Sequence, residues 1–211
     1  KDEIILKSTD GLPTYHFAHL VDDVLMGTTH VIRDQNWLPS TPLHIQLFNA
    51  YGAKPLKYAH ISPVNKKDGD SIRKLSKRKD PEAAVSYYHE MGIPVEAAMI
   101  YVATISNSNF EAWYDCNKDK TLDDFNLTFN KISKSGPLFD VEKLNSISKE
   151  YLSKMKAVDV YNNLLEWSLE FDTDFANLIT KYKDYTINIL NIEREQKKPR
   201  KDFSCYSEIK S

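Results

Sequence analysis

The stretch DGLPTYHFAHLVDDVLMGTTHVIRDQNWLPSTP, residues 10–42, decides the class of fold. Its first part has apolar residues at helical spacing and then a glycine where a helix would stop: Phe17, Leu20, Val21, Val24, Leu25 and Gly27. The run HVIR (30–33) that follows is typical of a short buried strand. The stretch therefore predicts a helix over 14–26 and a strand over 30–33.

The flanking residues continue this alternation. EIILKS (3–8) is rich in strand-forming residues and precedes the turn TDGLP. On the other side, Ser40 or Thr41 can cap a second helix that ends at Gly52. The inward face of this second helix is predicted to carry Leu43, Leu47, Phe48 and Tyr51. Strand, helix, strand and helix in turn predict an α/β layer with parallel pairing.

The alternation ends at KYAHISPVNKKDGD (57–70), which predicts a strand followed by a loop. From Pro81 onward the pattern is helical nearly throughout, with Asp140 and Asp159 as predicted N-caps. Apolar residues form stripes at helical spacing: Ala84, Val85, Tyr88 and Met91; residues 96–106; Val141, Leu144, Ile147 and Tyr151; Tyr161, Leu164 and Leu165; Phe175, Leu178, Ile179, Tyr182 and Ile189. We expect an α/β portion to about residue 80, followed by an all-α portion.

The composition excludes several classes of protein. The 211 residues carry a formal net charge of −2, which argues against a protein that coats nucleic acid by bulk charge. Cys116 and Cys205 form neither a disulfide framework nor a metal cluster and suit a reducing cytosol, so we expect a cytoplasmic protein. No apolar run approaches the roughly 20 residues that span a bilayer. Because the chain opens without Met on KDEIILKS and stops within FSCYSEIK, we expect a fragment of a longer protein.

A basic segment, KKDGDSIRKLSKRKDPE (66–82), follows the α/β portion. Lys74 and Lys77 bracket Ser76, and two ammonium groups with a hydroxyl on a flexible loop can hold phosphate oxygens. The segment has no glycine-rich cradle, so it is not a P-loop. Two alternatives stay open for this loop: an ordinary solvated charge run, and a nuclear-import or nucleic-acid patch.

A second candidate site surrounds the first predicted strand. Tyr15 and His19 are four residues apart and share a helix face, and Arg33 ends the strand. Ligands of parallel α/β sheets bind at strand ends, where an arginine can grip a carboxylate through two hydrogen bonds. The alternative is that Tyr15 and His19 are ordinary half-buried residues and that Arg33 pairs with Asp22 or Asp34.

DGLPTYHFAHLVDDVLMGTTHVIRDQNWLPSTPLHIQLF, followed later by RKLSKRKDP, resembles the second half of the catalytic domain of glutamyl-tRNA synthetases, in their clostridia-type bacterial version. KLSKR is similar to the KMSKS-type signature of class I synthetases. The resemblance implies the later half of a Rossmann-type domain over 1–80, a helical stem-contact region over 81–136 and the start of a helical anticodon-binding domain over 137–211.

The resemblance also implies which residues bind ATP. Lys77 would contact the ATP phosphates, supported by Lys74, Ser76 and Arg78, and Trp37 would lie near the adenosine. It implies ATP with Mg²⁺ as substrate, and neither a zinc site nor another resident metal, since the zinc-binding cysteine cluster of some relatives is absent.

For the amino acid, the resemblance places Tyr15 and His19 in the pocket and Arg33 on the glutamate carboxylate. This chain departs from the family pattern in two places. His19 stands where the family usually has Asn, and Gln35 and Asn36, next to the nucleotide, stand where it commonly has two glutamates. A single change in a hydrogen-bonding pocket can move specificity between glutamate and glutamine.

The activity implied is ligation of glutamate to tRNA(Glu) through a glutamyl-adenylate, by a monomer with no membrane partner. Basic residues of the helical portion would meet tRNA phosphates: Lys131, Lys134, Lys181, Arg194, Lys197 and Lys198. The HIGH signature of such enzymes is not among these residues, so we expect the 211-residue chain to be inactive alone. The alternatives are a glutaminyl-tRNA synthetase-like paralogue and a non-catalytic tRNA-binding or regulatory module.

Overall fold

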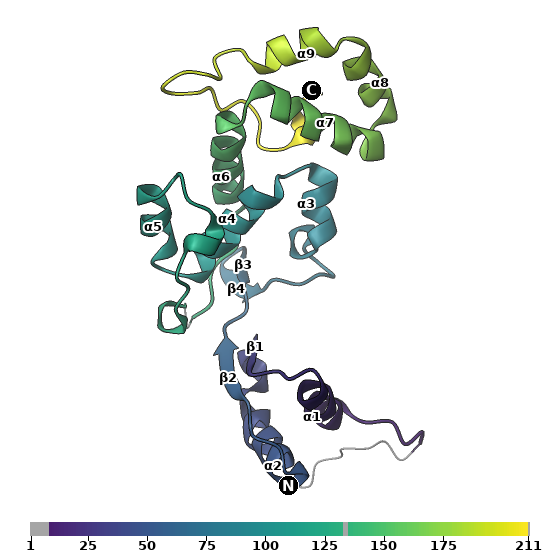
Figure 1. The fold of residues 1–211 in the computed structure, drawn as a ribbon, viewed down its shortest axis with the longest axis vertical. Coiled ribbons are helices and arrows are strands. Elements are labelled where there is room, and N and C mark those ends of the chain that lie inside the picture. The colour runs from purple at the N-terminus through teal and green to yellow at the C-terminus, as the bar shows by residue number, and fades with distance from the viewer. Residues whose placement is uncertain (1–8, 133–134, 211) are drawn as a thin grey trace. The chain divides into compact units, whose positions relative to one another are not determined.

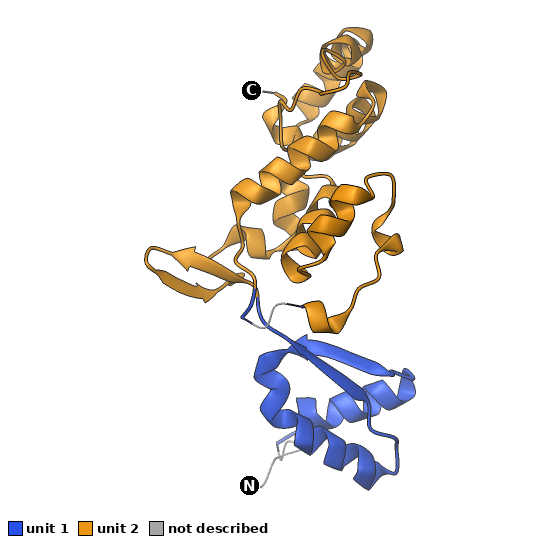
Figure 2. Cartoon of the chain, turned by 90° about the vertical axis from the view of Figure 1, so that its left-hand side faces the viewer, with its two compact units in different colours: residues 1–63, 132–136 blue, residues 64–131, 137–211 orange. Residues whose placement is uncertain are grey.

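A computed structural model describes residues 9–132 and 135–210. The strand predicted over 3–8 lies outside the described residues. The chain divides into two compact units, which we call the first unit (1–63 with 132–136) and the second unit (64–131 with 137–211) (Figure 2). The finer division at residues 80 and 136 stays a prediction.

The first unit is an α/β layer. Its elements are α1 (Tyr15–Leu25), β1 (His30–Asp34), a 3-10 helix (Gln35–Ser40), α2 (Thr41–Tyr51) and β2 (Lys57–Ile61) (Figure 1). The two strands pair in parallel, with His30 opposite Lys57 and Arg33 opposite His60. The predicted helices, the strand over 30–33 and the parallel pairing are confirmed. Two details are wrong: no residue of β1 is buried, and Tyr51, predicted on the inward face of the second helix, is 59% exposed. α1 packs on α2, Leu20 of α1 and Phe48 of α2 are both buried, and the ring centroids of His19 and Phe48 lie 6.0 Å apart.

The second unit opens with a β-hairpin that was wrongly predicted as a loop. β3 (Asn65–Asp68) and β4 (Ser71–Lys74) pair antiparallel through a two-residue turn, in which Gly69 has φ +60°. A two-residue turn that begins with glycine is a strong hairpin signal. The signal was obscured because most side chains of both strands are charged, so no alternation of apolar and polar residues marks them.

The rest of the second unit is helical, as predicted. Its helices are α3 (Val85–Met91), α4 (Val95–Ser106), α5 (Phe110–Cys116), α6 (Val141–Lys154), α7 (Ala157–Phe171), α8 (Thr173–Lys181) and α9 (Lys183–Leu190), with short 3-10 helices at Pro81–Ala83, Leu122–Asp124, Phe129–Lys131 and Tyr206–Glu208 (Figure 1). Within residues 9–132 and 135–210, no helix is both long and apolar enough to cross a membrane.

One predicted N-cap of the second unit is confirmed, and other details of its helix predictions change. Asp140 caps α6 as predicted, since its carboxylate accepts hydrogen bonds from the amides of Glu142 and Lys143 at 2.9 and 3.1 Å. Asp159 is not a cap, because α7 begins at Ala157 and this side chain lies in the first turn. The stripe from Phe175 to Ile189 is two helices, broken at Tyr182, where the backbone leaves the helical region (φ −114°, ψ 41°). Val85, placed in a buried stripe by its spacing, is 86% exposed.

Two apolar clusters form the core of the second unit. The first cluster is centred on α7 and includes Leu152, Val160, Tyr161, Leu164, Ile179 and Tyr206. The second joins α4 to α6 and includes Ile93, Tyr101, Leu144 and Cys205. The C-terminal segment connects them, because Tyr206 donates its amide to the carbonyl of Gly92 at 3.0 Å and the Ser148 hydroxyl donates to the Ser204 carbonyl at 2.6 Å.

Arg194, predicted to meet RNA, is instead buried in this core. Its Nε donates to the carbonyl of Leu190 at 2.7 Å, at the end of α9, and its Nη1 donates to the carbonyls of Leu152 and Met155 at the end of α6. The guanidinium therefore caps two helix C-termini, which attract cations. Lys134 lies outside the described residues. The other basic residues predicted to meet RNA are exposed: Lys131, Lys181, Lys197 and Lys198.

The contact between Gly92 and the C-terminal segment generates a first prediction. Gly92 has φ +70°, and a Cβ there would lie 2.8 Å from the Cβ of Tyr206 and 3.0 Å from Nε1 of Trp167. Gly92→Ala should lower the free energy of unfolding by about 2–4 kcal/mol, from left-handed strain and overpacking together. Urea unfolding followed by far-UV circular dichroism measures this loss.

Gly69→Ala is the matched control in the same unit. Gly69 has φ +60°, but a Cβ added there would meet no atom within 4 Å, so this variant should lose only the strain of about 1–2 kcal/mol. Equal losses in both variants would contradict the close packing of Tyr206 on Gly92.

Candidate functional site

Arg33, near the end of β1, is the centre of a polar cluster in the first unit. Its Nε donates to Nε2 of His60 at 3.2 Å, and its Nη1 lies 2.9 Å from Nδ1 of His44. Nη2 donates to the hydroxyl of Thr41 at 3.1 Å and to the carbonyl of Trp37 at 3.4 Å. Within the described part of the chain its four partners are neutral acceptors, and Asp22 and Asp34 are not among them. These bonds hold the guanidinium without neutralising its charge.

Aromatic rings pack around this guanidinium. The ring centroid of Tyr15 lies 4.3 Å from that of Trp37 and 5.9 Å from that of His19, to which it is parallel within 6°. The Arg33 carbon Cζ lies 4.8 Å from the ring centroid of Tyr58 and 5.9 Å from that of Trp37. We call this set the Arg33 cluster: Tyr15, His19, Arg33, Trp37, His44, Tyr58 and His60. Tyr15, His19, Arg33 and Trp37, singled out in the sequence, thus come together.

The histidines of the Arg33 cluster are held in defined states. Because Nδ1 of His44 accepts from Arg33, its proton lies on Nε2, which faces Nδ1 of His16 at 3.0 Å. Burial, with nearby His19 and Arg33, lowers the pKa of His44 to about 4. Burial also lowers the pKa of His19, against the effect of Asp23. These imidazoles are therefore neutral at pH 7, where they can accept hydrogen bonds.

Both nitrogens of His19 are engaged by protein. Nδ1 pairs with Asp23, and Nε2 lies 3.1 Å from the Tyr58 hydroxyl.

Gln35 and Asn36 begin the 3-10 helix, at the surface of the first unit. The Ser62 hydroxyl donates to Oε1 of Gln35 at 3.1 Å.

Sequence reasoning missed His44, Tyr58 and His60. A signal existed for each of them: His44 and Phe48 are four residues apart on the inward face of α2, and Tyr58 and His60 are two apart on one face of β2. Among the described residues, no three His, Cys, Asp or Glu side chains are placed to hold a metal ion.

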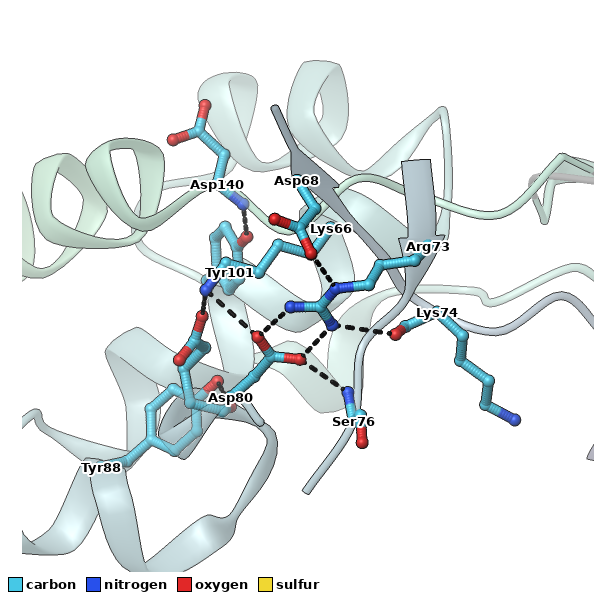
Figure 3. A network of polar contacts seen from close by, with 10 residues as sticks. Lys66, Asp68, Arg73, Lys74, Ser76, Asp80, Tyr88, Tyr101 and Asp140 are labelled. Carbon is cyan, nitrogen blue, oxygen red and sulfur yellow. Dashed lines mark hydrogen bonds and ion pairs between the residues drawn. The ribbon is translucent and has the colours of Figure 1, made fainter. Parts of the chain in front are cut away.

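The KLSKR turn (74–78) is the second candidate site and belongs to the second unit. Asp80 ties it at its base, because the Ser76 amide donates to Oδ2 of Asp80 at 2.9 Å (Figure 3). The Asp80 amide in turn donates to the Ser76 carbonyl at 2.8 Å. Lys77 and Arg78 lie within the closed turn and are exposed. The flexible loop predicted here is therefore a hydrogen-bonded turn.

A buried ion pair supports the turn. Arg73 donates to both oxygens of Asp80, at 2.6 and 2.8 Å, and Asp80 is only 2% exposed. Hydrogen bonds from Arg73, assisted by the Ser76 amide, hold the pKa of the Asp80 carboxyl well below its usual range. Lys66 lies between Asp80, at 3.4 Å, and Glu82. Sequence reasoning missed this network, although an acidic residue directly after three basic ones was a visible signal.

The turn presents cations in a form that phosphates can use. Figure 3 shows the Lys74 side chain and the Ser76 hydroxyl directed away from the Asp80 network. Exposed ammonium and guanidinium groups on such a turn can donate charge-assisted hydrogen bonds to phosphate oxygens.

The lowered pKa of His44 generates a second prediction. Between pH 6.5 and about 4 the unfolded chain binds a proton at His44 that the folded chain does not. The free energy of unfolding of the first unit should therefore decrease as the pH falls, by about 2 kcal/mol between about pH 7.5 and pH 5. His44→Asn, which keeps an acceptor for Arg33, should reduce this dependence, and the part that remains belongs to His19 and His60, whose pKa values burial also lowers.

The measurement is a urea titration at each pH, followed through the amide NMR signals of β1. His30→Asn, at an exposed histidine of the same unit, is the control and should keep the slope of the native protein. An unchanged slope in His44→Asn would contradict a neutral, buried His44.

Comparison with known proteins identifies the family to which the chain belongs. The family model described as tRNA synthetases class I (E and Q), catalytic domain, matches residues 1–146. A glutamate–tRNA ligase of Clostridium perfringens (strain 13 / Type A) is 48% identical over 210 residues, which are 100% of this chain and 38% of that protein. The glutamate–tRNA ligase of Clostridium beijerinckii is 48% identical over 208 residues, 99% of this chain and 38% of the relative.

A solved structure is similar over nearly the whole chain. The crystal structure of a glutamate tRNA ligase from Elizabethkingia meningosepticum, in complex with its amino acid, matches with a TM-score of 0.71 and 27% identity. The match covers 99% of this chain and 42% of that one. The chain thus spans about two fifths of the length of these relatives, and it belongs to the class I tRNA synthetases of the E and Q group.

Proposed function

We propose that this chain is part of a ligase that joins glutamate to tRNA(Glu) through a glutamyl-adenylate. The observation that carries the proposal is the 48% identity to glutamate–tRNA ligases along the whole chain. In the first step a glutamate carboxylate attacks the α-phosphate of ATP in line and pyrophosphate leaves. In the second, a ribose hydroxyl of the tRNA end takes the glutamyl group and AMP leaves. Such reactions depend on positioning and on neutralising charge.

Arg33 is the residue proposed to bind the glutamate side chain. Its four hydrogen bonds go to neutral groups, so its positive charge attracts an acid. One N–H of Nη1 and the long bond from Nη2 to the Trp37 carbonyl, at 3.4 Å, are available for exchange with a carboxylate. Tyr15 and His19 would line the pocket, and Trp37 would lie near the adenosine.

Lys77 is the residue proposed to contact the ATP phosphates, with Lys74, Ser76 and Arg78 in support. Negative charge grows on the leaving pyrophosphate, and exposed cations on a tied turn stabilise this charge without moving. Mg²⁺ enters as part of the ATP substrate. The exposed lysines of the helical portion are proposed to meet tRNA phosphates, which fix position without reading sequence. We also propose that the whole ligase is a monomer and acts in the cytoplasm.

The test is aminoacylation by the polypeptide of the complete natural reading frame that includes residues 1–211. Glutamate and glutamine are offered separately with total tRNA and ATP. We expect charging with glutamate, because Arg33 keeps its charge. Charging with glutamine alone would mean that His19, Gln35 and Asn36 have changed the pocket. A folded protein that charges neither would instead be a non-catalytic tRNA-binding module.

The same assay generates a third prediction. Lys77→Ala should slow adenylate formation by about 10²-fold, measured as ATP–pyrophosphate exchange, because it removes a cation from the leaving group. The KM for glutamate should not change. Lys79→Ala is the matched control, because Lys79 is an exposed lysine of the same basic run. Equal losses in both variants would mean that the turn acts only through its total charge.

A further inference from the structure

The carboxylate of Asp80 lies beneath the KLSKR turn and does not reach the surface. It is 2% exposed and accepts hydrogen bonds from the Ser76 amide and from both Nη atoms of Arg73, at 2.6 to 2.9 Å. Nζ of Lys66 lies 3.4 Å from its Oδ1 (Figure 3). A buried carboxylate with this many donors occupies one position, because any rotation would leave a buried charge unpaired.

Asp80 closes the turn from both ends. Its side chain accepts the Ser76 amide, and its own amide donates to the Ser76 carbonyl at 2.8 Å. The Lys79 amide also donates to that carbonyl, at 3.0 Å. Residues 77 and 78 are thus held between two hydrogen-bonded positions, and the backbone that carries their cations is fixed before any phosphate arrives.

The charge of Asp80 is balanced from outside the turn. Its ion-pair partners within the described part of the chain are Arg73 of β4 and Lys66 of β3, and they do not include Lys77, Arg78 or Lys79. The carboxylate therefore orders the turn without forming an ion pair with the Lys77 ammonium or the Arg78 guanidinium. A carboxylate that paired with Lys77 would have competed with a phosphate for the same ammonium group.

The residues that hold Asp80 are themselves anchored. Lys66 and Arg73 are opposite each other in the β3–β4 register. β3 is fixed at Asn65, whose amide donates to the Pro137 carbonyl at 2.8 Å and whose carbonyl accepts the Phe139 amide at 2.7 Å. A site residue held by such supports keeps its geometry better than one on an untied loop.

We propose that Asp80 is a positioning residue, which holds the KLSKR turn in the conformation that meets the phosphates of ATP. The proposal rests on the proposed function for the identity of the ligand. Asp80 lies below the turn and touches no substrate. Its role is to set where Lys77 and Arg78 stand, so that the binding energy of ATP need not order them.

The test compares Asp80→Asn with Asp68→Asn. Both carboxylates bond Arg73, but Asp68 does so through Nε at 2.6 Å, is exposed and makes no contact with Ser76 in the described network. Hydrogen exchange of the Ser76 amide is measured first, on this chain without nucleotide. Asp80→Asn should speed it by at least about tenfold, since a charged partner is lost, and Asp68→Asn should leave it unchanged.

ATP–pyrophosphate exchange by the complete protein is measured second. Asp80→Asn should raise the KM for ATP or lower the rate of the step by roughly tenfold to a hundredfold, with the KM for glutamate unchanged. Asp68→Asn should stay within about twofold of the native protein. Arg73→Gln leaves the hydrogen bond between Asp80 and the Ser76 amide but removes its support, so it should give an intermediate loss of ATP–pyrophosphate exchange. This variant replaces Asp80→Asn in the test if Asp80→Asn fails to fold.

The outcomes separate this proposal from the proposed function. Two results for folded Asp80→Asn would overturn the proposal. One is hydrogen exchange of the Ser76 amide at the native rate. The other is fast hydrogen exchange at Ser76 together with a native KM for ATP and a native rate of ATP–pyrophosphate exchange. A change in the KM for glutamate equal to that for ATP would also overturn it, because a general loss of structure moves both. If the native protein charges no amino acid, the proposed function fails. Hydrogen exchange of the Ser76 amide, measured with ATP or inorganic pyrophosphate added, still decides whether Asp80 orders a phosphate-binding turn.

Discussion

A dense run of positive charge opposes its own ordering unless an anion compensates it, and in the second unit the buried carboxylate of Asp80 lies beneath such a run. Arg73 and Lys66 meet its charge from the hairpin, and the Ser76 amide meets it from the turn. Repulsion among neighbouring lysines opposes any single conformation of such a run. The buried carboxylate favours one conformation and turns a charged segment into a candidate phosphate site.

The two arginines that organise the candidate sites use their charge in opposite ways. Arg73 is paired with Asp80 and Asp68, so its charge is neutralised within the protein and it acts as a support. Arg33 is surrounded by imidazoles, a hydroxyl and a carbonyl, so its geometry is fixed while its charge remains available to an anion. The neutral state of His44 is essential to this second arrangement, because a protonated imidazole could not accept from Arg33.

The sequence predicted those parts of the structure that local patterns determine. Helical spacing located α1 and α2, which bury Leu20 and Phe48, and a short apolar run located β1. The β3–β4 hairpin was missed because its residues are charged. The burial of Arg194 depends on the ends of two helices that are distant in sequence, and no local pattern contains that information. In the Arg33 cluster, spacing and resemblance identified Tyr15, His19, Arg33 and Trp37, whereas the supporting role of His44 and His60 required the strand register.

His19, which departs from the family pattern, has both of its ring nitrogens engaged within the protein. A histidine in place of asparagine introduces a ring with two nitrogens, and each must find a partner when buried. Here Asp23 engages Nδ1 and the Tyr58 hydroxyl faces Nε2, while the ring stacks on that of Tyr15. On the proposed function, His19 then shapes the pocket through packing and has no hydrogen-bonding group left over for the substrate. The choice between an acid and an amide would rest instead on the charge of Arg33, whose hydrogen-bond partners among the described residues are all neutral.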